Sequence, residues 1–243
     1  MIEAAQMVNF FKDKGGFFNR ETSENSISQW FAEFKDVYAR RPISDNVGGI
    51  GPNPAAWLFL TAKIINPELI VESGVWRGQS SWLLRQACPA AAMHSFDVNL
   101  RRLLQRGENI AYHEQDWLRH RFGHVDPDRS LLFFDDHVNQ ARRVSESFAR
   151  GFRFLVFDDN LPADKAACAG LPPFPTIHML FDKEISFGER FSWQTNRGKT
   201  KYYKYREKDT FGAQALIEKH FIFPGTPTYM TLVKLVRPGK VAG

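Results

Sequence analysis

From residue 67 to residue 160 the sequence alternates short apolar runs with amphipathic segments, and this alternation leaves few folds open to the chain. Helix-like stretches separate the apolar runs, at 78–87, at 139–150 and through Leu103. The runs that we expect to be buried strands cover residues 69–71, 91–96, 110–112, 131–134 and 152–157. Continuous apolar strands separated by helices are typical of a parallel sheet covered on both faces. We therefore predict an α/β, Rossmann-like doubly wound fold with a mostly parallel sheet, helices on both faces and right-handed connections.

A helix is expected before this core. Apolar residues recur at helical spacing from Ile27 to Tyr38. Ser26 and Gln29 fit a capping box at its start, and Pro42 ends it.

A loop rich in turn residues follows at 45–52, and residues 54–65 form a short apolar helix. The pair Gly48-Gly49 allows the loop to act as a lid, although a plain connector fits it equally well. We therefore divide the chain into an N-terminal helical extension over 1–66, in which this loop is a candidate lid, and a Rossmann-like domain over 67–243.

The pattern is weaker after Asn160. Residues 161–175 are rich in Pro and Ala and predict a loop, 209–220 predict a helix, and 228–236 predict a strand that completes the edge of the sheet. Within this part, the segment from about 161 to 225 is expected to shape the substrate site.

Basic and aromatic residues interleave at 197–206. This run can receive an anionic or sugar substrate, or nucleic acid. It fits equally a solvated edge hairpin, in which lysines discourage pairing with other chains.

Charge and cysteine content restrict the setting of the protein. The chain has 243 residues with a formal net charge of +5, which favours anionic partners without choosing among them. Cys88 and Cys168 are far apart and fit neither a zinc spacing nor a disulfide framework, so we expect a reducing, cytoplasmic location. The first residues lack the features of a signal peptide, and no apolar stretch reaches the roughly 20 residues of a membrane helix. We expect no membrane partner.

The first candidate site is the turn after the first predicted strand. Glu72 ends that strand, and Gly74 and Gly78 let the backbone pass close to a ligand. Ser80 and Ser81 follow at the start of the next helix, whose first N–H groups can bind an acceptor. The spacing is Gly-x-x-x-Gly, whereas dinucleotide binders carry Gly-x-Gly-x-x-Gly. A tight turn without a ligand is the alternative.

Two acidic residues extend this site. Asp97 ends the second predicted strand, where a carboxylate can accept both hydroxyls of a ribose; as the alternative, it caps a helix. Asp116 follows the third strand and can accept from an adenine amino group, while Trp117 can stack on the ring.

Acidic pairs end the next two predicted strands. Asp135-Asp136-His137 follows the fourth strand, and Asp158-Asp159 follows the fifth. Carboxylates that face each other repel unless they are protonated or bind a cation, and hard oxygen ligands suit Mg²⁺, Ca²⁺ or Mn²⁺. Helix and loop capping is the alternative.

His137 adjoins these pairs and can take a proton from a substrate hydroxyl, orient a ligand or bond the backbone. The other histidines, such as His94, His113 and His178, have no comparable setting, and we interpret them as structural.

The segment from Glu72 to Ser81, Asp97 and the two acidic pairs resemble the class I S-adenosylmethionine-dependent methyltransferases. The likeness is closer to metal-dependent O-methyltransferases: the catechol type, the macrocin or macrolide-sugar type, and the rhamnosyl methyltransferase and cephalosporin-hydroxylase-like group. It covers about residues 67–160, with a loose match near Tyr229.

The resemblance implies S-adenosylmethionine as the cofactor. Gly74 and Gly78 would line its methionine part, Glu72 would lie near its amino group, Asp97 would hold the ribose and Asp116 would meet the adenine. The residues assigned to the cofactor are Glu72, Ser73, Gly74, Gly78, Ser80, Ser81, Asp97, Asp116 and Trp117.

The resemblance also implies Mg²⁺ or another divalent cation. The Asp-His of the catechol type matches Asp136-His137, and the acidic pair of the sugar type matches Asp158-Asp159. We therefore predict Asp136, Asp158 and Asp159 as metal ligands, with Asp136 and His137 as catalytic residues. The lysine base of the catechol type is replaced by Asn139, which leaves the identity of the base open.

The leading hypothesis is O-methyl transfer to a hydroxyl of a small polar acceptor, either a sugar-containing or an anionic molecule. Related enzymes often associate, so a homo-oligomer is compatible with this hypothesis. One alternative is a non-catalytic nucleic-acid-binding module, which the basic-aromatic run favours but which gives no reason for the acidic pairs. A nicotinamide-dependent oxidoreductase is another, and the absent Gly-x-Gly-x-x-Gly counts against it.

Overall fold

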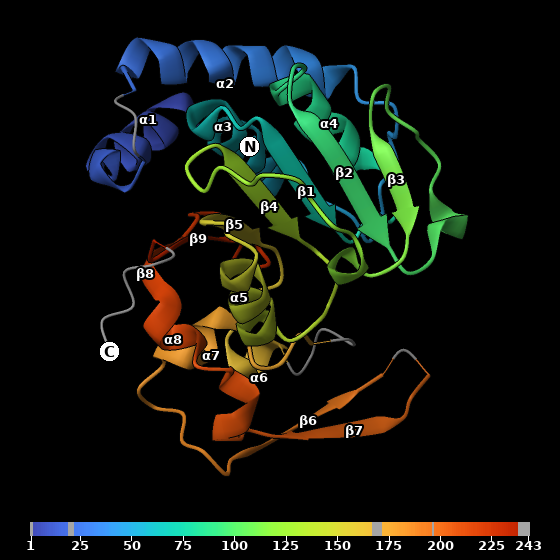
Figure 1. Ribbon diagram of the computed structural model, residues 1–243, viewed down its shortest axis with the longest axis vertical. Coiled ribbons are helices and arrows are strands. Elements are labelled where there is room, and N and C mark those ends of the chain that lie inside the picture. Colours follow the sequence, from blue (N-terminus) through green and yellow to red (C-terminus); the bar gives the residue numbers. More distant parts are fainter. Residues whose placement is uncertain (1, 19–21, 167–171, 196, 238–243) are drawn as a thin grey trace. The chain divides into compact units, whose positions relative to one another are not determined.

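A computed structural model describes residues 2–18, 22–166, 172–195 and 197–237 (Figure 1). The chain forms two compact units, Met1–Phe133 and Phe134–Gly243, which we call the first and the second unit. Cys168 lies outside the described residues. No helix in the described ranges is both long enough and apolar enough to cross a membrane.

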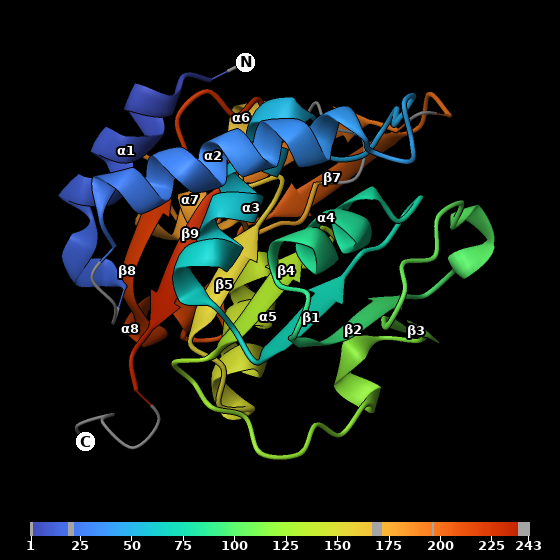
Figure 2. The ribbon, with the colours of Figure 1, turned by 90° about the horizontal axis from the view of Figure 1, so that it is seen from above.

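Three helices begin the first unit, and α2 contacts both α1 and α3 (Figure 2). Ser23 is the N-cap of α2, and its side chain accepts from the backbone N of Ser26 at 3.1 Å. The predicted capping box at Ser26 is therefore wrong, because the helix begins three residues earlier. Almost every residue of α3 is buried, as its apolar composition predicts. The elements of this region are α1 (Ala4–Asp13), η1 (Gly15–Phe17), α2 (Glu24–Ala39) and α3 (Pro52–Ile65).

The predicted strands follow in the first unit. Their order is β3-β2-β1-β4, and both β1 with β2 and β2 with β3 pair in parallel. The apolar residues of β1 and β4 are buried except Leu69, which is partly buried, and this burial explains their continuous apolar runs. The elements are β1 (Leu69–Ser73), α4 (Gln79–Ala87), β2 (Ala92–Asp97), β3 (Ala111–Glu114), η3 (Trp117–Arg119) and β4 (Ser130–Phe134).

The helix predicted through Leu103 is wrong, because only the short 3-10 helix η2 (Leu100–Arg102) forms there. The backbone N–H groups of Leu104 and Gln105 both donate to the carbonyl of Arg77 at 3.1 Å. The chain is thereby drawn against the turn after β1, and the helix cannot continue.

The second unit contributes β5, β8 and β9 to the seven-stranded sheet, together with helices. β9 pairs antiparallel with both β5 and β8, and all five residues of β9 are buried. The predicted late strand is therefore confirmed, but β8 lies at the edge of the sheet instead of β9. The elements are α5 (Gln140–Ala149), β5 (Phe154–Phe157), α6 (Ala163–Ala166), α7 (Ile177–Phe181), η4 (Glu207–Thr210), α8 (Ala213–Leu216), β8 (Ile217–Ile222) and β9 (Thr231–Leu235).

The helix predicted at 209–220 is wrong. Phe211 and Gly212 have left-handed backbone angles, φ 52° and 65°, which end η4 and leave only one short helix, α8, before β8 begins. Since β8 takes the last part of this segment, the apolar residues there serve a strand.

The basic-aromatic run forms half of a hairpin, as one of its two interpretations predicts. β6 (Arg190–Gln194) pairs antiparallel with β7 (Thr200–Lys204) in a separate two-stranded sheet (Figure 1). Phe174 stacks on Tyr203 with ring centroids 5.0 Å apart, whereas Tyr202 is exposed. The hairpin thus packs one aromatic face on the second unit and leaves the other in solvent.

These elements make a Rossmann-like α/β fold of seven strands, mostly parallel and flanked by helices, which confirms the predicted fold class. The division at residue 66 stays a prediction.

We expect Gly78→Ala to lower the free energy of unfolding by about 2–3 kcal/mol. Gly78 has φ +93°, and a Cβ there would lie 2.3 Å from the carbonyl oxygen of Gln105. Urea denaturation of the two proteins measures the difference. Gly123→Ala is the control, because no atom lies within 4 Å of a Cβ at that exposed loop position. Equal stability of the Gly78 variant and the wild type would contradict the close approach.

Candidate functional site

The turn after β1 has the geometry of a ligand-binding turn. Gly74 has φ +97°, and its N–H donates to the carbonyl of Phe96 at 2.9 Å, so the turn stays joined to β2. Gly78, also left-handed, is the N-cap of α4. The glycines are therefore required by the backbone path, as the sequence predicts, and the first N–H groups of a nine-residue helix follow them.

Asp97 holds this turn in place. One carboxylate oxygen, Oδ2, accepts from the N–H groups of Val75 at 3.0 Å and Trp76 at 3.3 Å, and Oδ1 accepts from Asn99 at 2.9 Å. Asp97 is not the N-cap of a helix, because Gly78 is the N-cap of α4 and Asn99 that of η2. A carboxylate has about four acceptor positions, so Oδ1 keeps capacity for one further donor. A single ribose hydroxyl fits this count better than the pair.

Glu72 lies completely buried beneath the turn. Its Oε2 accepts from the hydroxyls of Ser81 and Ser95, the latter at 2.7 Å. Burial raises the pKa of Glu72 to about 7, which the serine hydroxyls partly oppose. The other oxygen, Oε1, is buried and has no hydrogen-bond donor among the described residues. Such an atom suits a donor that the polypeptide does not supply.

The glycine loop at 45–51 is tied to the same turn. The indole Nε1 of Trp76 donates to the carbonyl of Val47 at 3.2 Å, and the guanidinium of Arg77 donates to the carbonyl of Asp45. A Cβ on Gly48 would lie 3.7 Å from the ring of Trp76. The loop is thus placed against the turn by its backbone, an arrangement that the lid hypothesis requires.

The residues predicted to meet the adenine have other contacts. The Oδ1 of Asp116 accepts from the backbone N of Leu118 at 2.9 Å and so caps η3. Trp117 is fully buried, with 0% of its surface exposed, and its ring lies near that of Phe122. Stacking of an adenine on Trp117 would therefore require the ring to be uncovered.

The second unit brings the acidic pairs together. The backbone N of Asp158 donates to the carbonyl of Phe134 at 2.9 Å, which holds the ends of β4 and β5 side by side. One ligand atom from each of Asp135, His137 and Asp159 lies within 4.8 Å of the others. His137 Nδ1 lies 3.2 Å from Asp159 Oδ2, and both residues have φ of 54°. Left-handed backbone at two non-glycine residues is costly, and it turns both side chains into one cluster.

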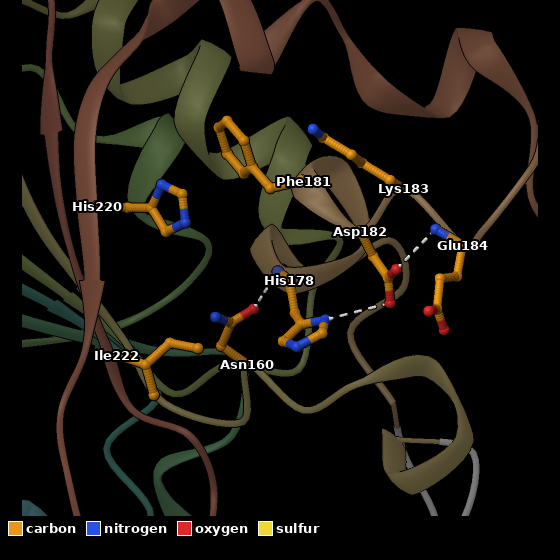
Figure 3. Close-up of a pocket in the computed structure, with 8 residues that line it drawn as sticks. All are labelled: Asn160, His178, Phe181, Asp182, Lys183, Glu184, His220 and Ile222. Atoms are coloured by element: carbon orange, nitrogen blue, oxygen red, sulfur yellow. Dashed lines mark hydrogen bonds and ion pairs between the residues drawn. The ribbon is translucent and has the colours of Figure 1, made fainter.

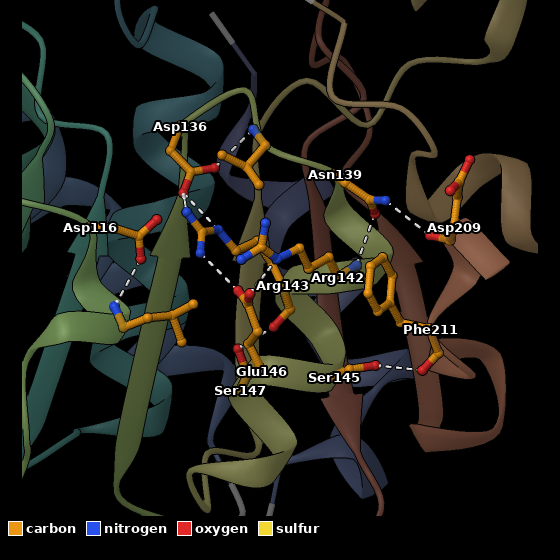
Figure 4. A network of polar contacts seen from close by, with 12 residues as sticks. Asp116, Asp136, Asn139, Arg142, Arg143, Ser145, Glu146, Ser147, Asp209 and Phe211 are labelled. Carbon is orange, nitrogen blue, oxygen red and sulfur yellow. Dashed lines mark hydrogen bonds and ion pairs between the residues drawn. The ribbon is translucent and has the colours of Figure 1, made fainter. Parts of the chain in front are cut away.

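Asp136 is directed elsewhere (Figure 4). Its Oδ2 accepts from Nε of Arg143 at 2.9 Å and from Nη2 at 2.8 Å, and its Oδ1 accepts from the backbone N of Val138. Arg143 also contacts Glu146 at 2.7 Å, and its side chain is 2% exposed. Both oxygens of Asp136 thus bind groups of α5 and of the loop before it, and its role as a metal ligand stays a prediction.

Asp158 is buried behind the cluster. The Thr228 hydroxyl donates to its Oδ1, which also accepts from the backbone N of Asp159 at 2.9 Å. Burial, with Asp159 as a second cause, raises the pKa of Asp158 to about 6.

Asp135 is the residue that sequence reasoning placed in the acidic run but did not choose as a ligand. Successive residues after a strand point in different directions, and the sequence alone does not tell which of two adjacent aspartates faces the sheet edge. Arg143, three residues after the start of α5, is the sequence feature that could have indicated a partner for Asp136.

A separate hollow of about 400 Å³ lies in the second unit near the end of β5 (Figure 3). His178 and Asp182 face it from α7 and its end, His220 faces it from β8, and Asn160 lies at its base. The Oδ1 of Asn160 accepts from the backbone N of His178 at 2.6 Å. None of these residues was predicted as functional.

The chain matches no known protein-family profile and no curated protein. Among solved structures it is similar to the methyltransferase PaMTH1 of Podospora anserina bound to SAH, at 12% identity and a TM-score of 0.48 over 97% of this chain and 98% of that chain. It is similar to the O-methyltransferase TomG of Streptomyces achromogenes in complex with SAM, at 13% identity and a TM-score of 0.46 over 97% and 100%. A structure described as cmcI-D160 Mg-SAM shares 18% identity at a TM-score of 0.38, and the similarity spans 51% of this chain and 64% of that one, less than two thirds.

We expect Glu72→Gln to flatten the pH dependence of stability between about pH 4.5 and pH 7. The unfolded chain releases this proton near 4.5 and the folded protein near 7, so the folded state holds more protons in this window and the wild type loses stability as pH rises. The difference should reach up to about 3 kcal/mol. Urea denaturation across the pH range measures it, with Glu114→Gln, an exposed carboxylate at the end of β3, as the control. Parallel curves for the Glu72 variant and the wild type would refute the shift.

A second prediction compares two adjacent arginines of α5. Arg143→Gln should lower the free energy of unfolding by about 3 kcal/mol, because it leaves the partly buried Asp136 without its ion pair. Arg142→Gln removes an exposed pair with the same Glu146 and should cost less than about 1 kcal/mol. Chemical denaturation distinguishes them, and equal losses would show that burial of Arg143 is not decisive.

Proposed function

We propose that the protein is an S-adenosylmethionine-dependent O-methyltransferase that acts on a hydroxyl of a small polar acceptor. The observation that carries the proposal is the junction of the turn after β1 with Asp97. The carboxylate at the end of β2 orders the glycine turn at the end of the neighbouring parallel strand, which is where α/β folds bind nucleoside cofactors.

Several features of the first unit suit this cofactor. S-adenosylmethionine carries a sulfonium and an amino group, and the buried Oε1 of Glu72 offers an acceptor without a partner among the described residues. The carboxylate of S-adenosylmethionine suits the N-terminus of α4, whose first N–H groups can bind an anion. The remaining acceptor capacity at Asp97 Oδ1 suits a ribose hydroxyl.

We assign hydroxyl activation to the second unit. Asp135, His137 and Asp159 would hold a divalent cation, and two carboxylates with one imidazole suit Mn²⁺ as well as Mg²⁺. When bound, the cation would lower the pKa of the acceptor hydroxyl. This set replaces Asp136 by Asp135, because Asp136 is paired with Arg143.

His137 has a second role open to it in the same geometry. The carboxylate of Asp159 accepts from Nδ1 of His137 and so fixes the imidazole ring. This leaves Nε2 as the atom that would take the hydroxyl proton. A chelator distinguishes the two roles. Activity that depends on His137 only as a base persists when a chelator is present, whereas activity that depends on a bound cation is lost.

The acceptor is proposed to be polar and either sugar-containing or anionic. The net charge of +5 supports an anionic group, and the exposed Tyr202 and the lysines of the β6–β7 hairpin support a sugar or phosphate.

Calorimetry of the full chain with S-adenosylmethionine, with and without Mg²⁺ or Mn²⁺, tests the function. We expect saturable binding that Asp97→Ala weakens at least about tenfold, since one hydrogen bond to a charged group is worth about 1.5–3 kcal/mol. Glu114→Gln, at the end of the neighbouring β3, should bind like the wild type. Absence of cofactor binding under every metal condition would sink the proposal.

The metal set has its own test. Asp135→Asn and Asp159→Asn should each weaken Mn²⁺ binding at least about tenfold, whereas Asp136→Asn should retain the wild-type affinity within a factor of about three. Electron paramagnetic resonance of free Mn²⁺ measures the affinities, and Asp164→Asn, an exposed carboxylate of α6, is the control. Loss of binding in Asp136→Asn alone would restore the ligand set predicted from the sequence.

A further inference from the structure

Three histidines that were not assigned to the cofactor converge in the first unit. One ring nitrogen from each of His94, His113 and His120 lies within 4.8 Å of the others. His94 Nδ1 and His113 Nε2 are 3.1 Å apart, and the ring centroids of His113 and His120 are 4.8 Å apart. Imidazoles at such spacing are close enough for one ion to reach all three nitrogens.

The pairing of β2 and β3 explains the convergence. His94 is in register with Ala111, and Phe96 with His113, so the two histidines lie diagonally on the same face of adjacent parallel strands. Ser95 points to the opposite face, where it bonds Glu72. The histidine cluster is thus separated from the Glu72 side of the sheet by the sheet itself. His120 reaches the cluster from the end of η3.

The surroundings favour neutral imidazoles at His94 and His113. All three rings are partly buried, and Phe96 and Phe122 lie against them, with the His113 ring 4.5 Å from that of Phe96. Burial and the neighbouring imidazoles lower the pKa of His94 and of His113. Neutral rings keep a lone pair on one nitrogen, which is the form that binds metals.

We propose that His94, His113 and His120 bind a borderline transition-metal ion, with Zn²⁺ as the reference ion and water at the fourth position. Three imidazole nitrogens and no carboxylate suit Zn²⁺, Cu²⁺ or Ni²⁺ and disfavour Mg²⁺ or Ca²⁺. The ion would join β2, β3 and the segment after η3, and so would stabilise the outer strand of the sheet.

This inference differs from the interpretation of His94 and His113 as structural residues. It does not depend on methyl transfer, since the cluster uses no residue of the proposed cofactor or hydroxyl-activating sites.

Calorimetry with Zn²⁺ tests the site on the untagged, chelator-treated full chain. The His137→Ala variant serves as the background, because it weakens the second cluster that could take the same ion. In this background we expect one Zn²⁺ per chain and a higher melting temperature with Zn²⁺. Adding His113→Ala or His120→Ala should weaken binding at least about tenfold and abolish the thermal shift.

His124→Ala is the matched control, because this exposed histidine lies close to His120 in the sequence but outside the cluster. His120→Ala covers the case in which His113→Ala fails to fold, since position 120 follows a short 3-10 helix and lies outside the strands. Co²⁺ substitution adds a spectroscopic readout, because tetrahedral nitrogen ligation gives intense visible absorption. Absence of Zn²⁺ binding, or an equal loss in His124→Ala, would overturn the proposal and would leave the Asp97 test of the cofactor unaffected.

Discussion

The parallel pairing of β1 with β2 depends at its end on one carboxylate. Asp97 receives two consecutive N–H groups of the turn after β1, which would otherwise lack acceptors where the chain leaves the sheet. The left-handed Trp76 and the close pass of residues 103–105 over Gly78 both depend on this fixed turn. The same interaction therefore determines where α4 begins and which backbone atoms stay open toward a ligand.

In the second unit, five charged or titratable groups lie just after the ends of two strands: Asp135, Asp136 and His137 after β4, and Asp158 and Asp159 after β5. Arg143 neutralises Asp136 from the first turns of α5, Thr228 bonds Asp158 from the segment before β9, and Asp159 turns toward His137. Only Asp135, His137 and Asp159 then have ligand atoms that converge. The arrangement thus gives neighbouring residues of similar chemistry different contacts.

The strands between residues 67 and 160 were predictable, because continuous apolar runs between helices are typical of buried strands in an α/β fold. The errors lie where a local backbone feature overrides periodicity: the left-handed Phe211-Gly212 step that converts a predicted helix into α8 and β8, and the two amides bound by Arg77 that stop η2. The site could be predicted as a region but not by residue. Asp136 and Asp135 are alike in sequence, and only the reach of Arg143, seven residues after Asp136, separates their roles. The histidine cluster could not be predicted, because it depends on the register of β2 with β3, which cannot be read from the sequence.

The placement of β9 has a consequence for how the protein is made. β9 is the buried partner of both β5 and β8, yet the chain supplies it long after β5. During synthesis β5 therefore emerges with an apolar edge that no local segment can cover, and the second unit cannot close its core until Thr231–Leu235 has left the ribosome. The first unit has its strand pairs from nearby segments and is free to fold earlier. A nascent chain stalled between β8 and β9 would accordingly have a folded first unit and an incomplete second unit with exposed apolar surface. Chaperones would have to protect this intermediate from aggregation.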